Sequence, residues 1–204
     1  MVSTLDGPVL EVLSRTTRSL TGREVHRLTG TGSPNGVRLA LARLTEQGVV
    51  HAEQRSNAVF YSANREHLTW PAVQCLTALR STLIRSLGDE LTSWQCPPAH
   101  ASLFGSAARG DGDATSDIDI LLIRPDDVPN EDPLWDKQVD DLRERVWKWT
   151  GNRCHAFELD RHRLAEHVVA KDPLVDALLR DAIDLAGRDL GTILKDLADV
   201  DTNR

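Results

Sequence analysis

Two aspartates separated by a single residue are the clearest chemical signal in this sequence of 204 residues. Asp117 and Asp119 open an apolar segment that runs to Ile123, and the alternation of residue types there predicts a β-strand. Side chains two apart on a strand point to the same face and are separated by roughly 6.5 to 7 Å at the backbone. Because hard divalent cations prefer carboxylate oxygens, Asp117 and Asp119 are predicted to bind Mg²⁺.

A glycine and a serine precede this pair of carboxylates. Gly105 permits a tight turn after the apolar run 101–104, and Ser106 offers a hydroxyl and an N–H group where a short helical turn begins. Arg109 adds a positive charge close by. Phosphate groups suit this set, so the stretch predicts a nucleotide site with magnesium beside it.

The motifs in this stretch are those of a known family. In chain order they read Gly105-Ser106, Ala108-Arg109-Gly110 and Ser116-Asp117-Ile118-Asp119. Residues 99–190 thereby resemble the polymerase-beta-like nucleotidyltransferases, in particular the minimal bacterial kind. The resemblance implies that ATP or another nucleoside triphosphate binds at Gly105, Ser106, Arg109 and Ser116. It further implies that two Mg²⁺ ions bind the aspartates, and that a nucleoside monophosphate passes to an acceptor hydroxyl while pyrophosphate leaves.

Such a transferase normally has a third acid on a neighbouring strand. Here that strand is predicted over 153–159, and alternation puts Glu158 and Asp160 on one face and His155 on the other. Glu158 is predicted to be the third catalytic and metal-binding carboxylate, because Asp160 suits the N-cap of the helix that follows. In the alternative register His155 faces the metals and the third acid is missing.

The first 66 residues differ in charge from the rest. They contain eight arginines, no lysine and six acids, a net charge of +2, so the remainder carries −9 of the total of −7. Three helices are predicted, over 8–15, from Thr21 to Gly30 and over 33–47, followed by strands over 49–53 and 58–62.

This order of elements resembles the bacterial winged helix-turn-helix regulators, whose third helix enters the major groove of DNA. The resemblance implies that Asn35, Arg38 and Arg43 face duplex DNA and that Arg55, at the tip of the wing, reaches a phosphate or the minor groove. The alternative is a module that contacts another protein.

The predicted fold class is α+β with three parts: a winged helix-turn-helix over 1–66, a linker helix over 67–98, and a nucleotidyltransferase domain with C-terminal helices over 99–204. The final helices are expected over 161–169 and 173–197. The linker carries an apolar stripe, and its partner is either the transferase domain or a second copy of the chain in a homodimer.

Composition adds the expected location. The sequence is 40% hydrophobic and 27% charged, as in ordinary globular proteins, and lacks a membrane-spanning apolar run and a signal-peptide pattern at its start, so a cytoplasmic protein is expected. The three cysteines are widely spaced and are predicted to be reduced.

The function predicted is a Mg²⁺-dependent nucleotidyltransferase coupled to a DNA-binding domain. The alternative is a transcription regulator whose transferase-like domain senses a nucleotide or holds a partner without turnover. Relatives of the minimal transferases modify antibiotics or belong to toxin–antitoxin pairs, so the acceptor is left open among a small molecule, an RNA and a protein.

Overall fold

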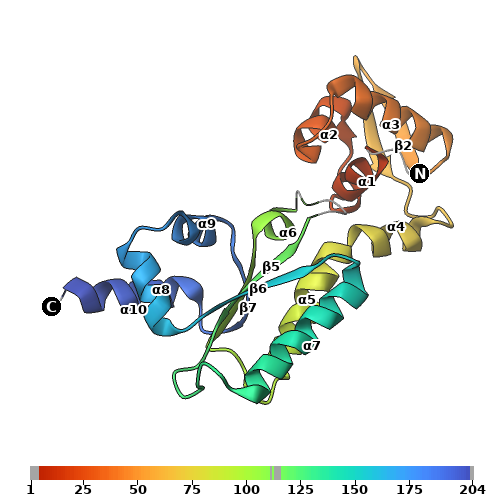
Figure 1. Cartoon of the computed structure of the whole chain (residues 1–204). Helices are drawn as coiled ribbons and strands as arrows, with labels where there is room; N and C mark the ends of the chain where they lie inside the picture. Colours follow the sequence, from red (N-terminus) through yellow and green to blue (C-terminus); the bar gives the residue numbers. More distant parts are fainter. Residues whose placement is uncertain (1–4, 111, 113–115, 203–204) are drawn as a thin grey trace. The chain divides into compact units, whose positions relative to one another are not determined.

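The computed structural model describes residues 5–110, 112 and 116–202, and it contains two compact units, Met1–Leu79 and Arg80–Arg204 (Figure 1). No helix in the described part of the chain is both long and apolar enough to cross a membrane.

The first unit combines helices with a small antiparallel sheet whose strand order is β1-β3-β2. The helices and the hairpin lie where the sequence predicts them, whereas the two-residue strand β1 is not predicted. Thr21 and Glu24 form the expected capping box at the start of α2. The elements are α1 (Asp6–Ser14), β1 (Leu20–Thr21), α2 (Gly22–Thr29), α3 (Pro34–Glu46), β2 (Val50–Arg55), β3 (Ala58–Ala63) and α4 (Trp70–Thr77).

The second unit is built on a four-stranded sheet of order β6-β5-β4-β7, in which only β5 and β6 are parallel. The helix α7 connects the parallel pair, as such a connection requires. The elements are α5 (Leu79–Thr92), β4 (His100–Phe104), α6 (Gly105–Arg109), β5 (Ile118–Ile123), α7 (Pro133–Thr150), β6 (Cys154–Leu159), α8 (Arg161–Val169), α9 (Pro173–Asp181), β7 (Ile183–Gly187) and α10 (Leu190–Thr202).

Helices cover both faces of this sheet (Figure 1). On one face Ile118, Ile120 and Leu122 pack with side chains of α5 and α7, and on the other Leu121 and Ile123 pack with α8, α9 and α10. The strand β5 is therefore apolar on both faces after Asp119, which fixes its place in the middle of the unit.

The predicted linker helix differs from the structure. Helix α4 ends at Thr77, and a separate helix, α5, begins at Leu79. Leu87 and Leu91 of α5 are fully buried in the core of the second unit. The apolar stripe of α5 thus belongs to the second unit, which begins near residue 80 rather than 99.

The end of the chain also differs from the prediction of one helix over 173–197. Strand β7 interrupts it, and Ile183 and Leu185, two residues apart, contact the apolar core beside α5 and α7. Gly187 has φ +78°, and a Cβ there would collide with the backbone of Ala99, so only glycine permits this close approach to β4.

Candidate functional site

Asp119 lies at the start of β5, between two strands that position it. Its register partners are Phe104 on β4 and His155 on β6. The Asp119 side chain is 27% exposed, and its Oδ1 lies 3.6 Å from Nδ1 of His155. Asp117 is exposed and directly precedes the strand. The parallel register therefore places His155, and not Glu158, beside Asp119.

The electrostatics of Asp119 are unusual for an aspartate. Burial raises the pKa of its carboxyl above the ordinary value, and the negative charge of Asp117 acts in the same direction, while His155 and Arg109 oppose the shift. The favourable interactions of the Asp119 carboxylate with His155 and Arg109 are thus smaller than the cost of its burial and of its repulsion by Asp117. A bound cation would supply the missing compensation.

Gly105 is fitted to Asp119. Its φ is +70°, which favours glycine, and a Cβ at this position would collide with Oδ2 of Asp119. The glycine thus allows the start of α6 to pass directly beside the carboxylate. This contact explains in structural terms why the motif begins with glycine.

The two motif serines lie close together. Both Ser106 and Ser116 face Gly112, since a Cβ built on Gly112 would lie 3.1 Å from Oγ of Ser106 and 3.5 Å from Cβ of Ser116. Arg109 extends from the end of α6 to α9, where its Nη1 lies 3.3 Å from Oδ2 of Asp181. The predicted phosphate-binding residues are therefore gathered around α6, with Arg109 anchored by Asp181.

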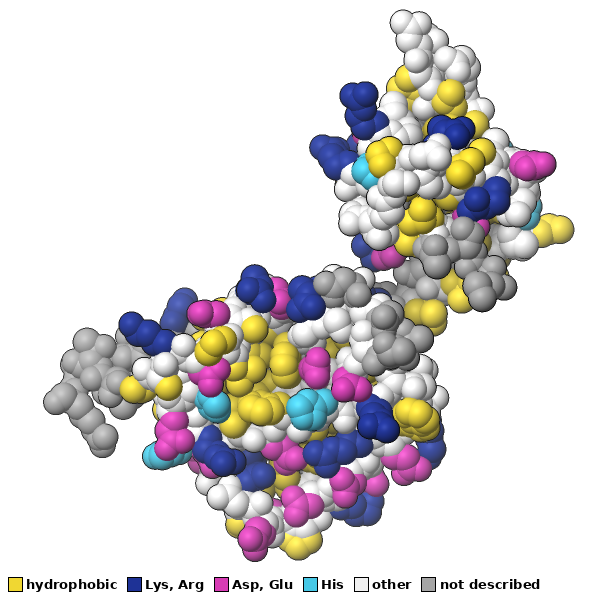
Figure 2. Space-filling view, turned by 45° about the horizontal axis from the view of Figure 1, so that its top comes forward, with side chains coloured by type: hydrophobic (Ala, Val, Ile, Leu, Met, Phe, Trp, Pro, Cys, Tyr) yellow, Lys and Arg dark blue, Asp and Glu magenta, His cyan; other side chains and the backbone are white. Residues whose placement is uncertain are grey.

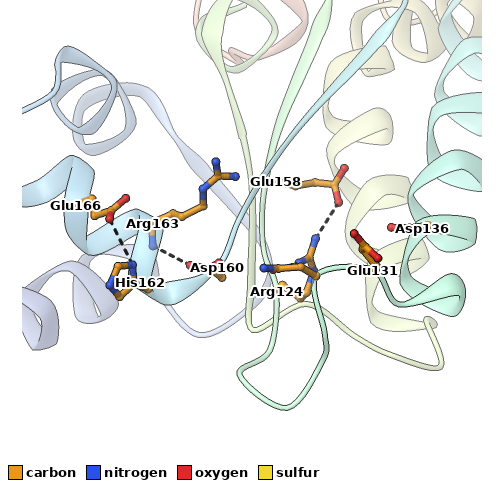
Figure 3. A pocket seen from close by; sticks show the side chains of 9 residues that line it. Arg124, Glu131, Asp136, Glu158, Asp160, His162, Arg163 and Glu166 are labelled. Atoms are coloured by element: carbon orange, nitrogen blue, oxygen red, sulfur yellow. Dashed lines mark hydrogen bonds and ion pairs between the residues drawn. The ribbon is translucent and has the colours of Figure 1, made fainter.

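The prediction for Glu158 needs correction. Glu158 pairs in register with Leu122, three positions beyond Asp119, and on the opposite face of the sheet. Its carboxylate accepts hydrogen bonds from Trp135 Nε1 at 2.8 Å and Arg143 Nη2 at 3.2 Å. Figure 3 shows its ion pair with Arg124, whose Nη2 lies 3.6 Å away. Glu158 therefore belongs to a structural network and cannot complete the site at Asp119.

The other acid that the sequence offers, Asp160, is also accounted for. It caps α8, accepting a hydrogen bond from the backbone N–H of Arg163 at 2.7 Å, as predicted. Of the three candidates, His155 is the one that lies within ion-pair distance of Asp119.

Comparison with known proteins agrees with the motif. Residues 84–182 match the family described as "Nucleotidyltransferase domain". The chain contains a nucleotidyltransferase domain. This assigns the class of enzyme, a nucleotidyltransferase, to the second unit.

Two solved structures are similar at low levels of identity. One is described as a toxin–antitoxin with AMP-PNP, with 16% identity, a TM-score of 0.36, and coverage of 61% of this chain and 87% of that one. The other is a mutant of the toxin–antitoxin MntA–HpeT, with 16% identity, a TM-score of 0.38 and the same coverage, 61% and 87%. A search of the curated proteins returned no match.

Asn152 supports the nucleotidyltransferase site in a way that the sequence did not reveal. It follows the helix-ending Gly151, and its Nδ2 donates to the carbonyl oxygen of Ser116 at 2.7 Å. The N–H of Ile118 donates to the carbonyl oxygen of Arg153 at 2.8 Å. Together these bonds fix the backbone on either side of Asp117.

The carboxylates around Asp119 are few for a metal site made by protein side chains alone. In the part of the chain that the structure describes, no group of three or more His, Cys, Asp or Glu side chains is arranged to hold a metal. Mg²⁺ does not require one, because it is commonly bound through one or two carboxylates together with substrate phosphates and water. Asp117 and Asp119 fit that mode of binding.

A cavity of about 740 Å³ lies away from these aspartates, at the opposite ends of β5 and β6 (Figure 3). Arg124, Glu158 and Asp160 are among its lining residues.

The face shown in Figure 2 carries hydrophobic side chains at the surface of the nucleotidyltransferase domain, between histidine, acidic and basic ones.

The residues predicted to face DNA lie in the first unit and have partners there. Asn35 and Arg38 are exposed on α3 and hydrogen-bonded to each other at 2.9 Å. Arg43 instead forms an ion pair with Asp6 of α1 at 2.6 Å. Arg55 pairs with Glu53 at 2.6 Å and lies over the ring of Phe60. Arg43 therefore helps to hold α1 on α3, a role that the sequence did not suggest.

Proposed function

We propose that this chain transfers a nucleoside monophosphate from ATP or another nucleoside triphosphate to an acceptor hydroxyl, in a reaction that requires Mg²⁺. The observation that carries the proposal is the Asp119 carboxylate, which is partly buried, lies against Gly105 and has only His155 within ion-pair distance among the described residues. The negative charge of a partly buried carboxylate with so few partners would be stabilised by a bound cation.

In this proposal different residues bind the metal and the phosphates. Asp117 and Asp119 hold the metal, while the N–H and hydroxyl groups of Gly105, Ser106 and Ser116 bind phosphate oxygens, and Arg109 adds positive charge. Bound Mg²⁺ would stabilise charge on the phosphates and lower the pKa of the acceptor hydroxyl. Backbone order around Asp117, maintained by Asn152, keeps these groups in place.

His155 lies on β6 beside Asp119 and is our candidate for the general base. Its side chain is 67% exposed and adjoins Asp119, so an acceptor can approach it from solvent. We assign to its Nε2 the acceptance of the proton from the acceptor hydroxyl. The loss of turnover in His155→Ala, with Glu158→Gln fully active, would support this assignment. Full activity in His155→Ala would contradict it.

The proposed function is tested by calorimetry of ATP with and without Mg²⁺. The parent protein is expected to bind ATP only when Mg²⁺ is present. The double variant Asp117→Asn/Asp119→Asn is expected to lose this Mg²⁺-dependent binding of ATP. Glu158→Gln is the matched control, because it removes a carboxylate from the same sheet outside the site. Equal binding by the double variant and the parent would contradict the metal site.

The acceptor is sought among RNA, proteins and small molecules by following label from α-³²P-ATP. The same assay distinguishes a transferase from a nucleotide sensor. A parent protein that binds MgATP but releases no pyrophosphate with any acceptor class would favour the regulator. A cytoplasmic location would supply both ATP and Mg²⁺.

We further propose that the first unit is a winged helix-turn-helix that binds duplex DNA. Support comes from the order of elements α1, α2, α3 and the β2–β3 hairpin, and from the basic side chains on the surface of this unit (Figure 2). Arg38 of α3 is exposed. Arg38→Ala is expected to reduce the slope of log affinity against log salt by about 1. Arg43→Ala serves as the comparison, since its ion pair with Asp6 should make its main effect one on stability. If both variants bind DNA as the parent does, the unit contacts protein instead.

A further inference from the structure

One arginine outside the signature holds the signature in place. Arg80 is the first residue of the second unit and lies on α5, before the residues 84–182 that match the family. Its Nε donates to the carbonyl oxygen of Ala107 at 3.1 Å, and its Nη2 donates to the carbonyl oxygen of Ala108. One guanidinium therefore binds two successive carbonyls of α6.

These carbonyls are the ones that most need a partner. Helix α6 has five residues, and the last carbonyls of any α-helix lack intrahelical donors. The N–H of Gly110 satisfies Ser106, with a distance of 2.8 Å to its carbonyl oxygen, and Arg80 satisfies the next two. A helix this short is not stable by itself, and a cation at its C-terminal end is favourable.

Gly110 is shaped to admit Arg80. It has φ +79°, and a Cβ added to it would lie 3.3 Å from Nε and 3.5 Å from Cδ of Arg80. The second glycine of the motif thus serves both the left-handed turn that ends α6 and the passage of the arginine. Gly105 and Gly110, at the two ends of α6, lie against Asp119 and Arg80 respectively.

From these contacts we propose that Arg80 is a positioning residue for nucleotidyl transfer. It fixes the C-terminal end of α6 so that Gly105 and Ser106, at the other end, keep their place beside Asp119. This inference rests on the proposed function, because it assigns the nucleotide phosphates to Gly105 and Ser106. In this role Arg80 acts through α6 and is assigned no contact with phosphate or metal.

The test compares Arg80→Ala and Arg80→Lys with Arg85→Ala, which removes an exposed arginine from the same helix. Loss of a supporting contact typically costs about 10-fold or more in metal affinity or activity, so Arg80→Ala is expected to weaken MgATP binding by about 10-fold. Arg80→Lys should recover only part, since an ammonium cannot reproduce the two-pronged geometry. Arg85→Ala should match the parent.

Hydrogen exchange at the Gly110 amide provides a second readout that needs no nucleotide. Arg80→Ala should speed that exchange by about 10-fold through local opening of α6, while amides of β5 keep their protection. If the parent fails to bind MgATP, the proposed function fails, and the amide exchange still decides whether Arg80 holds α6. Exchange and affinity in Arg80→Ala equal to those of Arg85→Ala would overturn the inference.

Discussion

Asp119 and Glu158 are carboxylates on adjacent strands of one sheet, yet their surroundings are opposite. Glu158 is met by Trp135, Arg143 and Arg124, at 2.8, 3.2 and 3.6 Å. Asp119 has only His155 within ion-pair distance, at 3.6 Å, among the residues described, and burial raises its pKa. The protein provides donors for the carboxylate that stabilises the fold and leaves the other short of them, as a site for an external cation requires.

The largest effect should come from exchanging charge for an amide at the two positions. Asp119→Asn is expected to reduce the rate of nucleotidyl transfer by about 100-fold or more, since a group that stabilises transition-state charge is lost. Glu158→Gln should stay within about threefold of the parent, as expected for a change outside the site. Pyrophosphate release with a working acceptor measures both rates. Comparable losses of the transfer rate in the two variants would contradict the assignment of Asp119 to the site and of Glu158 to a structural role.

Stability should show the reverse order. Glu158→Gln weakens hydrogen bonds from charged donors and is expected to lower the free energy of unfolding by about 1 to 3 kcal/mol. Asp119→Asn removes a charge whose burial is poorly compensated, and should leave the free energy of unfolding unchanged or raise it. Urea denaturation followed by tryptophan fluorescence gives both values. A larger loss of stability in Asp119→Asn than in Glu158→Gln would show that Asp119 is a structural residue.

Asn152→Ala should have an intermediate effect, because it disturbs the backbone next to Asp117 without removing a charged group. It removes the donor to the Ser116 carbonyl but no charged group, and is expected to cost about 1 kcal/mol of stability. Mg²⁺-dependent ATP binding should also weaken, because Asp117 follows Ser116 directly. Calorimetry alongside urea denaturation checks this, and loss of stability with unaltered ATP affinity would confine Asn152 to a structural role.

The smallest effect concerns a buried histidine on the neighbouring strand β4. Burial lowers the pKa of His100 below its ordinary value of about 6.5, although the Arg188 carbonyl at 2.7 Å and Asp184 at 4.0 Å favour the charged form. The unfolded chain keeps the ordinary value and takes up a proton first as the pH falls. Stability present above about pH 6.5 should therefore decline below it.

Urea denaturation at pH 7.5 and 5.5 measures this decline. His100→Gln should remove part of the pH dependence, whereas His162→Gln, at an exposed position, should not. An identical pH dependence in the parent and His100→Gln would rule out His100 as its source.

Local sequence patterns were sufficient for the elements that carry the motif. The alternation of aspartate and isoleucine over 117–120 and the turn at Gly105 depend on neighbours in the chain, and the structure confirms both. The same holds in the first unit for the capping box of Thr21 and Glu24. The family match likewise agrees with the resemblance drawn from the motifs.

The errors arose where distant segments meet. Alternation correctly separated Glu158 from His155, but the face that joins Asp119 depends on the register between β5 and β6, which a single strand does not reveal. The chain has no glycine or proline at Ala78, so the sequence does not predict that the helix ends there. Helix α5 is assigned to the second unit by the contacts of Leu87 and Leu91 with its core. Strand β7 exists because β4 accepts it, at a position where Gly187 permits the approach.

The contact between Gly105 and Asp119 also limits how this sequence can change over evolutionary time. A codon change that adds a side chain at residue 105 brings a methyl group too close to a carboxylate oxygen of Asp119, so that carboxylate must move from its present position even though Asp119 is still encoded. Two positions that lie 14 residues apart in the chain are therefore expected to constrain each other. Lineages that keep the aspartate are expected to keep the glycine, and those that lose either one become free to lose the other.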